Sequence, residues 1–575
     1  MPGFFISNCQ KKSELSNCIP EYCIQKDLSN QQFQIKWNTL NKFMNDKCMI
    51  ENEHYIVIQD GYLLNKGNLV KQYGVSKIEE LIVAMYENIG DTFFKLFRGS
   101  FSGAVYDKVL DKWLVYTNHI GDHAIFYSII NNNFYIGSQV NYILDACRAN
   151  HVKLHFHEVA AYQMLTFGFM EDDSTYASEI KRLRGGKYIC IKNGNVEVKE
   201  YHSFSVEEYS LTEKDEEEWI ELIDEAFQKA VQMEYDKDKE YGYLHLADLS
   251  GGLDSRMNVW AAHTLGIEHL LCCTYCKADY LDEEIAKEIS QYWEDELFVK
   301  PLDDCSFLYD IDEIIKMNGG LSLYFGITGG NRMLKNLSVW RYGLEHTGQC
   351  GDAIIGSFFK ERDDCKKHIP SGMYSERFKG KLDTDYRNSF DNYEIYLFYT
   401  RAFQGANCTH LIRTNYTEVV SPFLDVDFLE LCLSIPLELR MNHNIYKKWI
   451  IKKYPKAAAF RWEKINGLIT DTNAKRFMKK LVWRGPQKIK ELFQKNGPAY
   501  SMNPLDYWVN QKPQIRDFFQ RYFDDKKELI ERMCSSELQR DLNVMFDVGN
   551  AMEKMMVLTA IGAISYYFGD ADYER

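Results

Sequence analysis

Leu249-Ser250-Gly251-Gly252-Leu253-Asp254-Ser255 is the stretch that decides how the second part of the chain folds. It follows the apolar run Tyr241 to Ala247 and precedes a helical pattern that begins near Met257. An apolar run, two adjacent glycines and a helical pattern predict a strand, a tight turn and a helix N-terminus. Such a turn binds anions, because the unpaired N–H groups at a helix start point outward with the positive end of the helix dipole behind them.

The side chains of this turn suit a phosphate group. The two glycines let the backbone come close to a phosphate, and Ser250 and Ser255 carry hydroxyls that can donate to its oxygens. A bound polyphosphate would repel Asp254 unless a divalent cation lay between them, so we interpret Asp254 as a Mg²⁺ ligand. The alternative is a serine-glycine surface turn with an incidental aspartate.

The six residues 250–255, SGGLDS, resemble the pyrophosphate loop of the N-type ATP pyrophosphatases, which cleave ATP between its α and β phosphates. The turn is neither the GxxxxGK[ST] loop nor GxGxxG. The resemblance implies ATP and Mg²⁺ as the bound groups. It implies nucleotide contacts from Leu249, Ser250, Gly251, Gly252, Asp254 and Ser255.

Composition sets the class of protein. At 575 residues the chain is too long for one core, and its hydrophobic content of 45% supplies material for folded domains. The net charge of −15 argues against general binding to nucleic acid or an anionic membrane, and no uncharged apolar stretch is long enough to span a bilayer. Fifteen cysteines without disulfide-scaffold density fit reduced thiols. We expect a cytoplasmic protein.

Residues 1 to about 205 read as short strands separated by turn signals such as Asp60-Gly61 and Asn193-Gly194, which predicts a β-rich α+β domain. The expected strands are Tyr55 to Ile58, Ser102 to Tyr106, Trp113 to Tyr116, Ala124 to Tyr127, Asn133 to Ile136 and Tyr188 to Ile191.

Three segments of this part resemble the asparagine synthetase family, whose N-terminal half is a class II glutamine amidotransferase domain. Residues 98–107, RGSFSGAVYD, are similar to its RGMFAFALYD strand. Residues 118–127, NHIGDHAIFY, stand where its DRFGIKPLYY segment would be, and residues 183–188, LRGGKY, resemble its LPPGHY turn. The resemblance implies a shared fold for this half.

The glutaminase chemistry of that family is not expected here. It uses a cysteine that becomes the N-terminal residue, whose free α-amine is the base for the thiol, and position 2 is Pro2. Residues 60–65, DGYLLN, replace the family's glutamine-binding NGEIYN, and no aspartate stands near residues 75–77 to hold the substrate's α-amine. Cys9 is a weak substitute because it lacks the α-amine.

A second strong match is residues 347–357, TGQCGDAIIGS, which resemble the synthetase segment SGEGADELFGG. Asp352 falls on the aspartate that pairs with Asp254 around Mg²⁺ and pyrophosphate. Thr347 and Gly348 fall on nucleotide contacts, and Tyr275 lies at the carboxyl end of the next expected strand, where adenine is expected.

Gln349 departs from the family at this segment. The family has a glutamate there that handles the proton of the attacking amine, and an amide cannot act as a base near neutral pH. Either another group takes that proton or the nucleophile arrives differently. Lasso-peptide cyclases, a related group, also lack glutaminase function and vary at this position.

Two later segments extend the resemblance. Residues 418–425, EVVSPFLD, are similar to the EVRVPFLD signature, and residues 461–467, RWEKING, resemble the basic loop whose lysine contacts the α-phosphate. Lys464 is our candidate for that lysine, although the spacing leaves Arg461 as an alternative and a solvated surface lysine as another. A cation there would stabilise charge in both transition states.

Taken together, the resemblance implies an ATP-dependent, AMP-forming amide ligase that adenylates a carboxylate and transfers it to an amine that does not come from its own glutamine hydrolysis, as in β-lactam synthetases or peptide cyclases. Alternatives are amidation of a small carboxylate or sugar acid with free or partner-supplied ammonia, and a pseudoenzyme that only binds ATP. Two departures from asparagine synthetases argue against plain asparagine synthesis: Gln349, and Arg256 after SGGLDS, where those enzymes usually carry a small polar residue. The partners expected are carboxylate and amine substrates, small molecules or peptides, and a homodimer stays open.

The expected fold class is α/β and α+β in two domains. Residues 1–208 form a degenerate glutamine amidotransferase-like domain with a β-rich Ntn-hydrolase-like sandwich. Residues 209–575 form an ATP pyrophosphatase (PP-loop) synthetase domain, α/β and rich in helices.

Overall fold

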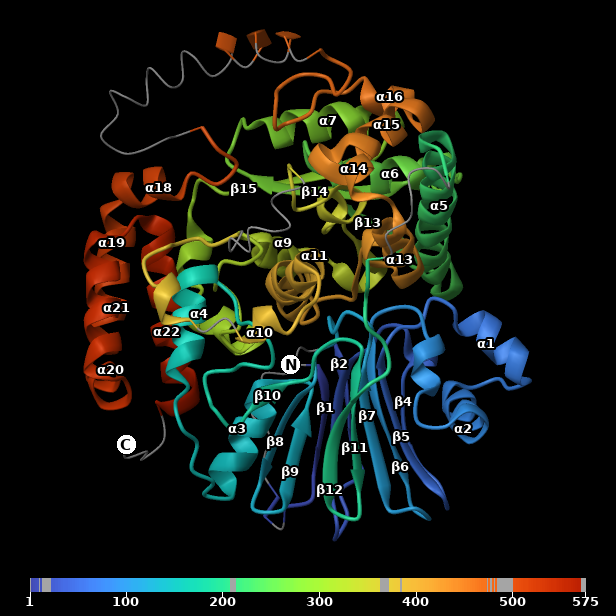
Figure 1. Cartoon of the computed structure of the whole chain (residues 1–575), viewed down its shortest axis with the longest axis vertical. Coiled ribbons are helices and arrows are strands. Elements are labelled where there is room, and N and C mark those ends of the chain that lie inside the picture. Colours follow the sequence, from blue (N-terminus) through green and yellow to red (C-terminus); the bar gives the residue numbers. More distant parts are fainter. Residues whose placement is uncertain are drawn as a thin grey trace.

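The computed structural model describes residues 2–9, 11–12, 22–206, 214–361, 372–382, 385–472, 474–475, 478–479, 481–482 and 500–569. These residues form a mixed α/β structure with two antiparallel sheets at one end and a parallel sheet at the other (Figure 1). A layer of C-terminal helices runs along one side of the molecule (Figure 1).

The two antiparallel sheets pack face to face as a sandwich. Side chains from the inner faces of both sheets, among them Phe4, Trp37, Ile58 and Val115, make one buried cluster, because alternate residues of each strand point inward. The first sheet has the order β10(Lys181–Arg182), β8(Phe126–Ile130), β9(Asn133–Gly137), β1(Gly3–Ser7), β3(Gln34–Leu40), β2(Cys23–Asp27), and the second β12(Asn195–Glu200), β11(Lys187–Lys192), β7(Lys112–Thr117), β6(Phe101–Asp107), β5(Tyr55–Gly61), β4(Cys48–Glu51).

Helices cover the outer faces of the sandwich. Helices α1 (Lys66–Tyr73) and α2 (Ile78–Ile89) lie on the second sheet, where Leu81 and Met85 pack in one core with Val105 and Leu114. Helix α3 (Val140–Ala149) lies on the first sheet, whereas α4 (Glu158–Phe167) packs against the C-terminal helix α22 (Ala551–Phe568). The N-terminal part of the chain is therefore a four-layer α/β/β/α arrangement.

The third sheet is parallel, with the order β15(Glu296–Pro301), β14(Leu270–Cys276), β13(Leu244–Asp248), β16(Tyr342–His346), β17(Val419–Val420). The chain starts at the central strand β13, builds outward to β15, then returns to the other side with β16. This reversal beside β13 is a topological switch point, and ligands of open α/β sheets bind at the carboxyl ends of strands at such a point.

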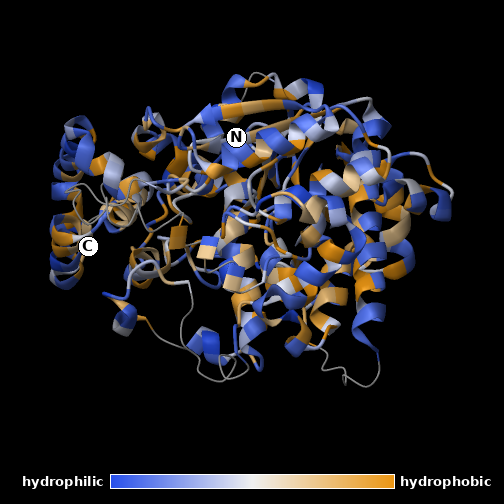
Figure 2. Ribbon diagram, turned by 90° about the horizontal axis from the view of Figure 1, so that it is seen from above, coloured by the Kyte–Doolittle hydropathy of each residue, from blue (hydrophilic) through white to orange (hydrophobic). Residues whose placement is uncertain are grey.

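Long helices pack on the parallel sheet, and others form the C-terminal layer beside it. Helix α5 (Glu216–Tyr241) starts at a capping box, in which Asp215 accepts from the Glu218 N–H at 2.9 Å, and packs on the sheet together with α6 (Asp254–Thr264). Helix α22 (Ala551–Phe568) is apolar all round and lies in the centre of the C-terminal layer, against α21 (Ser536–Val548) and α19 (Pro513–Asp525). Figure 2 shows hydrophobic and hydrophilic residues alternating along the helices.

The two expected domains share a core. One buried cluster joins Phe5 of β1 and Met164 of α4 to Ile314 of α8 (Ile311–Asn318) and Leu558 of α22. The expected boundary at 208/209 and most of the expected linker near 205–215 lie outside the described residues. Within the part of the chain that is described, no helix combines the length and apolar composition needed to cross a bilayer.

All six expected strands of the N-terminal part correspond to β5, β6, β7, β8, β9 and β11, although β8 begins two residues later than expected. Strands β1, β2, β3, β4, β10 and β12 were not predicted. Several are short or polar, as in β10, KR, and β12, NVEVKE, and pairing with neighbouring strands decides them.

Candidate active site

The turn 249–253 joins β13 to α6 and lies at the switch point of the parallel sheet. Helix α6 begins at Asp254, three residues earlier than the predicted start near Met257. The backbone N–H groups of Ser250, Gly251 and Gly252 donate to Ser255 Oγ (3.0 Å), Asp282 Oδ1 (2.7 Å) and Ser250 Oγ (3.2 Å). These hydrogen bonds to side chains fix the shape of the turn. Ser250 and Ser255 lie at the cavity described next.

A cavity of about 330 Å³ lies above this turn. It also includes Arg413, Thr328 and Met502. Of the residues predicted to contact the nucleotide or catalyse, those that line it are Leu249, Ser250, Gly252, Asp254, Ser255, Tyr275, Thr347, Gly348 and Gln349. Gly251 does not line it. The structure therefore gathers residues from three separate segments of the chain around one space.

Two glycines let the second segment, 347–352, pack directly on the turn. A Cβ on Gly348 would lie 2.3 Å from the Ser255 nitrogen, and a Cβ on Gly351 would lie 2.8 Å from Asp254 Cγ. Only glycine fits at such distances, so this close approach brings Asp254 and Asp352 side by side.

The charge of Asp352 acts on the Asp254 carboxyl group. Partial burial and the charge of Asp352 together raise the pKa of Asp254 to about 8, against hydrogen bonds from Tyr446 Oη (2.8 Å) and the Asp352 backbone and the charge of Lys464. A pair of carboxylates from separate loops is what a Mg²⁺ that keeps several waters accepts. The donor set therefore fits Mg²⁺, with Asp254 and Asp352 as its protein ligands.

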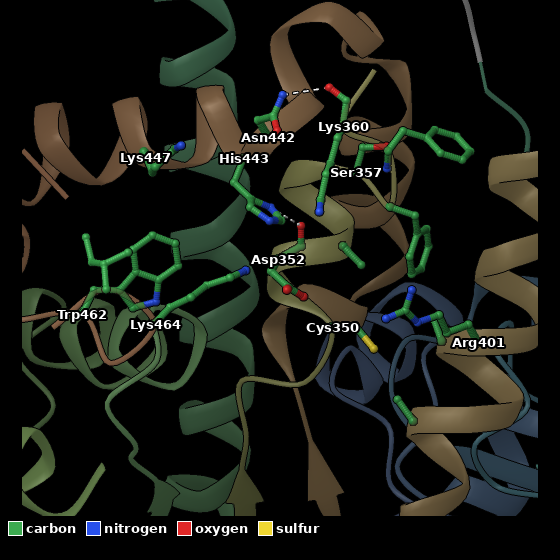
Figure 3. Close-up of a pocket in the computed structure, with 16 residues that line it drawn as sticks. Cys350, Asp352, Ser357, Lys360, Arg401, Asn442, His443, Lys447, Trp462 and Lys464 are labelled. Atoms are coloured by element: carbon green, nitrogen blue, oxygen red, sulfur yellow. Dashed lines mark hydrogen bonds between the residues drawn. The ribbon is translucent and has the colours of Figure 1, made fainter. Parts of the chain in front are cut away.

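A second cavity, of about 710 Å³, lies on the Asp352 side (Figure 3). Lys464 points from one wall toward Asp352, with its ammonium 5.6 Å from the Trp462 ring centroid, and Arg401 points in from the opposite wall (Figure 3). Lys360 also lines this space. Its cations Lys360, Arg401, Lys447 and Lys464 outnumber its one carboxylate, Asp352, which suits phosphate or carboxylate groups.

Unusual backbone conformations occur around both cavities. Thr328, Cys350, Asn442 and His443 have φ of 47°, 66°, 55° and 56°, in the left-handed region that few non-glycine residues adopt. Two π-helical segments, η5 (Asp352–Gly356) and η8 (Phe398–Gly405), line the second cavity. Such strain and π-helices are enriched at functional sites.

The structure separates the two basic candidates of the 461–467 loop. Lys464 lines the second cavity, whereas the Arg461 side chain turns to α7 (Leu281–Trp293) and pairs with Glu284 at 3.2 Å and Glu288 at 2.5 Å. Arg461 lines neither cavity.

Sequence reasoning missed several residues of this site. The fully buried Arg256 donates to the carbonyls of Gly251, Ala457, Phe460 and Arg461, so it ties the 249–253 turn to the loop that carries Lys464. Asp282, whose place at the start of α7 predicts a helix cap, instead accepts from Gly251. No pattern in the sequence marks the Arg256 contacts, because the partners are backbone atoms up to 205 residues away.

His410, of α12 (His410–Arg413), was also missed. It lies between Gln349 and Asp122 of the antiparallel part: Nε2 contacts Gln349 Oε1, and Nδ1 lies 3.3 Å from Asp122 Oδ2. The only sequence sign of this contact was the segment 118–127 that carries Asp122.

Pro2 stands at the position of the cysteine that the resemblance would require for glutamine hydrolysis. It lines a cavity of about 20 Å³ with Asp60, Asp122 and Glu418, and its carbonyl accepts from Gln139 Nε2 at 3.0 Å. A space of this size holds about one water molecule.

Comparison with known proteins bears on the antiparallel part. The search of curated proteins gives no match. Two solved structures, the glutamine phosphoribosylpyrophosphate amidotransferase from B. subtilis complexed with ADP and GMP and the allosteric regulatory enzyme of purine biosynthesis, are each 8% identical with a TM-score of 0.23. Each alignment covers 52% of this chain, with 85% and 74% of the other chain, and likeness at this TM-score carries no argument. Residues 45–202 match the family described as glutamine amidotransferase domain, so the chain contains an amidotransferase-type domain in its N-terminal part.

Proposed function

We propose that this protein is an ATP-dependent, AMP-forming amide ligase of the asparagine synthetase type, whose amine does not come from its own glutamine hydrolysis. The observation that carries the proposal is the juxtaposition of Asp254 and Asp352 at the switch point of the parallel sheet. A carboxylate pair beside a glycine turn whose serines, Ser250 and Ser255, line the cavity suits a nucleotide polyphosphate with its Mg²⁺.

The first cavity suits the nucleoside and α-phosphate of ATP, because it reaches from the carboxyl end of β14 to the 249–253 turn. Mg²⁺ would be held by Asp254 and Asp352, and when bound it neutralises charge on the β and γ phosphates. In the first step, an oxygen of the substrate carboxylate attacks the α-phosphorus and the bond to the β-phosphate oxygen breaks. Lys464 lies where it can balance the negative charge that the pyrophosphate gains.

In the second step, an amine nitrogen attacks the carbonyl carbon of the acyl-adenylate, and AMP leaves with the electron pair of the C–O bond. Two observations support an amine from outside. Pro2 offers neither a thiol nor a primary α-amine, and the cavity beside it, about 20 Å³, leaves no room for glutamine. An organic amine and free ammonia both fit this scheme.

The test is exchange of [³²P]pyrophosphate into ATP with pools of amino acids, sugar acids and peptides, in the presence of Mg²⁺. We expect exchange that depends on one pool and falls at least about 100-fold in Asp254→Asn. Asp236→Asn, on the exposed side of α5, is the matched control and should retain exchange. Exchange that survives in Asp254→Asn, or no exchange in any pool, would contradict the proposal.

A further inference from the structure

The side chain of Gln349 is held in one orientation by its neighbours. Its Nε2 donates to Thr409 Oγ1 at 2.8 Å. The Thr409 hydroxyl hydrogen is itself directed to the Ala406 carbonyl at 2.8 Å, so Thr409 can only accept from Gln349. The hydrogen-bond pattern therefore assigns the amide: its nitrogen faces Thr409 and its oxygen faces His410.

His410 completes the arrangement from the other end. Because Gln349 Oε1 is an acceptor, the contacting Nε2 of His410 carries a proton and donates. The other ring nitrogen faces Asp122 Oδ2 at 3.3 Å, and both side chains are buried. Asp122 is fixed in turn, because its Oδ1 accepts from Ser100 Oγ at 3.0 Å and from Asn118 Nδ2 at 2.5 Å.

Asp122 belongs to the amidotransferase-type domain, residues 45–202, whereas Gln349 lines the cavity proposed for the nucleotide. The Gln349 main chain is also pinned, since Ser421 Oγ donates to its carbonyl at 3.0 Å. The line Asp122–His410–Gln349 therefore runs from one half of the molecule into the active-site cavity of the other.

One of the two N–H groups of the Gln349 amide has no acceptor among the described residues. Within the described residues, Nε2 has the single acceptor Thr409, and the side chain borders the cavity of about 330 Å³. Donation from His410 to the amide oxygen polarises the amide and strengthens its N–H groups as donors. A fixed, polarised N–H at a reaction cavity has the properties of an oxyanion-hole donor.

We infer that Gln349 donates this N–H to the carbonyl oxygen of the acyl group during amide formation, and that His410 and Asp122 are positioning residues that hold it there. This inference rests on the proposed function. When the amine nitrogen attacks the acyl carbon, the carbonyl π electrons move to oxygen, and Gln349 stabilises the negative charge. The C–O bond to AMP then breaks, the carbonyl reforms, and the amine proton passes to water.

Through Asp122, the amidotransferase-type domain contributes to amide formation without hydrolysing glutamine. Without Asp122, the His410 ring loses the partner of its Nδ1, and the amide is free to rotate. Gln349 is thus a catalytic donor in place of a base, which accounts for a residue that cannot accept a proton near neutral pH.

The experiment separates the two half-reactions in the full chain. Pyrophosphate exchange reports adenylation, and hydroxylamine, as a generic amine, reports acyl transfer through the hydroxamate formed from the acid that supports exchange. In Gln349→Met we expect exchange within threefold of wild type and hydroxamate formation lowered about 10² to 10³-fold, with the KM for the acid unchanged. Asp122→Asn and His410→Phe should lower only hydroxamate formation, about tenfold.

Gln349→Glu is the most discriminating variant. A carboxylate at this position removes the donor and supplies a base, so the inference predicts slower hydroxamate formation, whereas a missing base predicts faster. His155→Phe, at an exposed histidine paired with Glu179, is the matched control for His410→Phe. Asp122→Asn preserves shape, so it keeps the test decisive even where His410→Phe fails to fold.

Each outcome of these assays supports or contradicts the inference. Hydroxamate formation within threefold of wild type in Gln349→Met, or faster in Gln349→Glu, would overturn the inference and leave the proposed function standing. Equal losses of exchange and hydroxamate formation in Gln349→Met would also overturn it, because the donor would then act before acyl transfer. No exchange by the wild-type protein in any pool would remove the proposed function and this inference with it.

Discussion

At the residue scale, the basic loop 461–467 carries two cations with different surroundings. Lys464 faces the cavity and the Asp254–Asp352 pair, whereas Arg461 faces two glutamates of α7. We expect Lys464→Met to lower the rate of pyrophosphate exchange about 10² to 10³-fold, because a fixed charge in the site stabilises the transition state. Arg461→Met should change it less than threefold. Steady-state exchange assays on both variants check this, and the reverse order of effects would show that Arg461 is the active cation.

The sequence predicted which residues of this site belong together where a local motif marks them. Asp254 and Asp352 could be paired because each follows a glycine turn of recognisable pattern. Arg256 could only be seen as a departure from a small polar residue, because its role depends on carbonyls of residues 457–461. His410 could not be found, since its two partners lie 61 and 288 residues away.

At the element scale, β13, its turn and α6 were predictable because strand, glycines and helix follow one another within one local segment. The π-helical segments η5 and η8 were not, since no side-chain period distinguishes them from an α-helix. The polar cluster between α5 and the parallel sheet was also missed: Asp238 Oδ2 of α5 lies 2.9 Å from His245 Nδ1 of β13 and 2.9 Å from His346 Nε2 of β16.

This polar cluster between α5 and the sheet makes the free energy of unfolding depend on pH. Burial opposes a charge on His346, but Asp238 and then Glu234 outweigh it and raise the pKa to about 9 from 6.5. A pKa raised in the folded state stabilises fully below pH 6.5, and the contribution is lost as pH rises through 9. In His346→Phe, which keeps the stacking on Tyr235, we expect the free energy of unfolding to fall by about 3 kcal/mol at pH 6.5.

The measurement is urea unfolding of both proteins at several values between about pH 6.5 and 9.5, the range over which His346 loses its proton. The difference between them should shrink over this range. Lys42, whose pKa burial lowers to about 7, changes charge in the same range but is present in both proteins, so it largely cancels. Burial raises the pKa of Glu234, 3.4 Å from His346, to about 7, so the difference between the proteins reports this pair of side chains together. A difference that stays constant with pH would mean that His346 is uncharged when folded.

At the scale of the whole molecule, buried polar contacts join the amidotransferase-type half to the parallel-sheet half. Lys47 pairs with Glu418 at 2.6 Å with both side chains almost fully buried, and Tyr62 Oη donates to the Val419 carbonyl at 2.8 Å. Because the halves also share the core of β1, α4 and α22, we expect them to unfold as one cooperative unit. Sequence patterns could place the halves in order but not join them, because an interface has no period along the chain.

The Lys47–Glu418 pair allows a quantitative test of this coupling. Lys47→Met leaves the Glu418 carboxylate buried without its partner, so we expect a loss of about 3–5 kcal/mol in unfolding free energy. Lys47→Met combined with Glu418→Met removes both charges of the close pair and should recover part of that loss, because the buried Asp60, 3.9 Å from Lys47, still loses its cation. Asp427→Asn breaks the more exposed Arg98–Asp427 pair across the same two halves and should cost less than about 1 kcal/mol.

Denaturant unfolding followed by both fluorescence and circular dichroism should give one transition for every variant. A Lys47→Met protein that unfolds in two steps, with the sandwich and the parallel sheet melting separately, would show that the halves are independent.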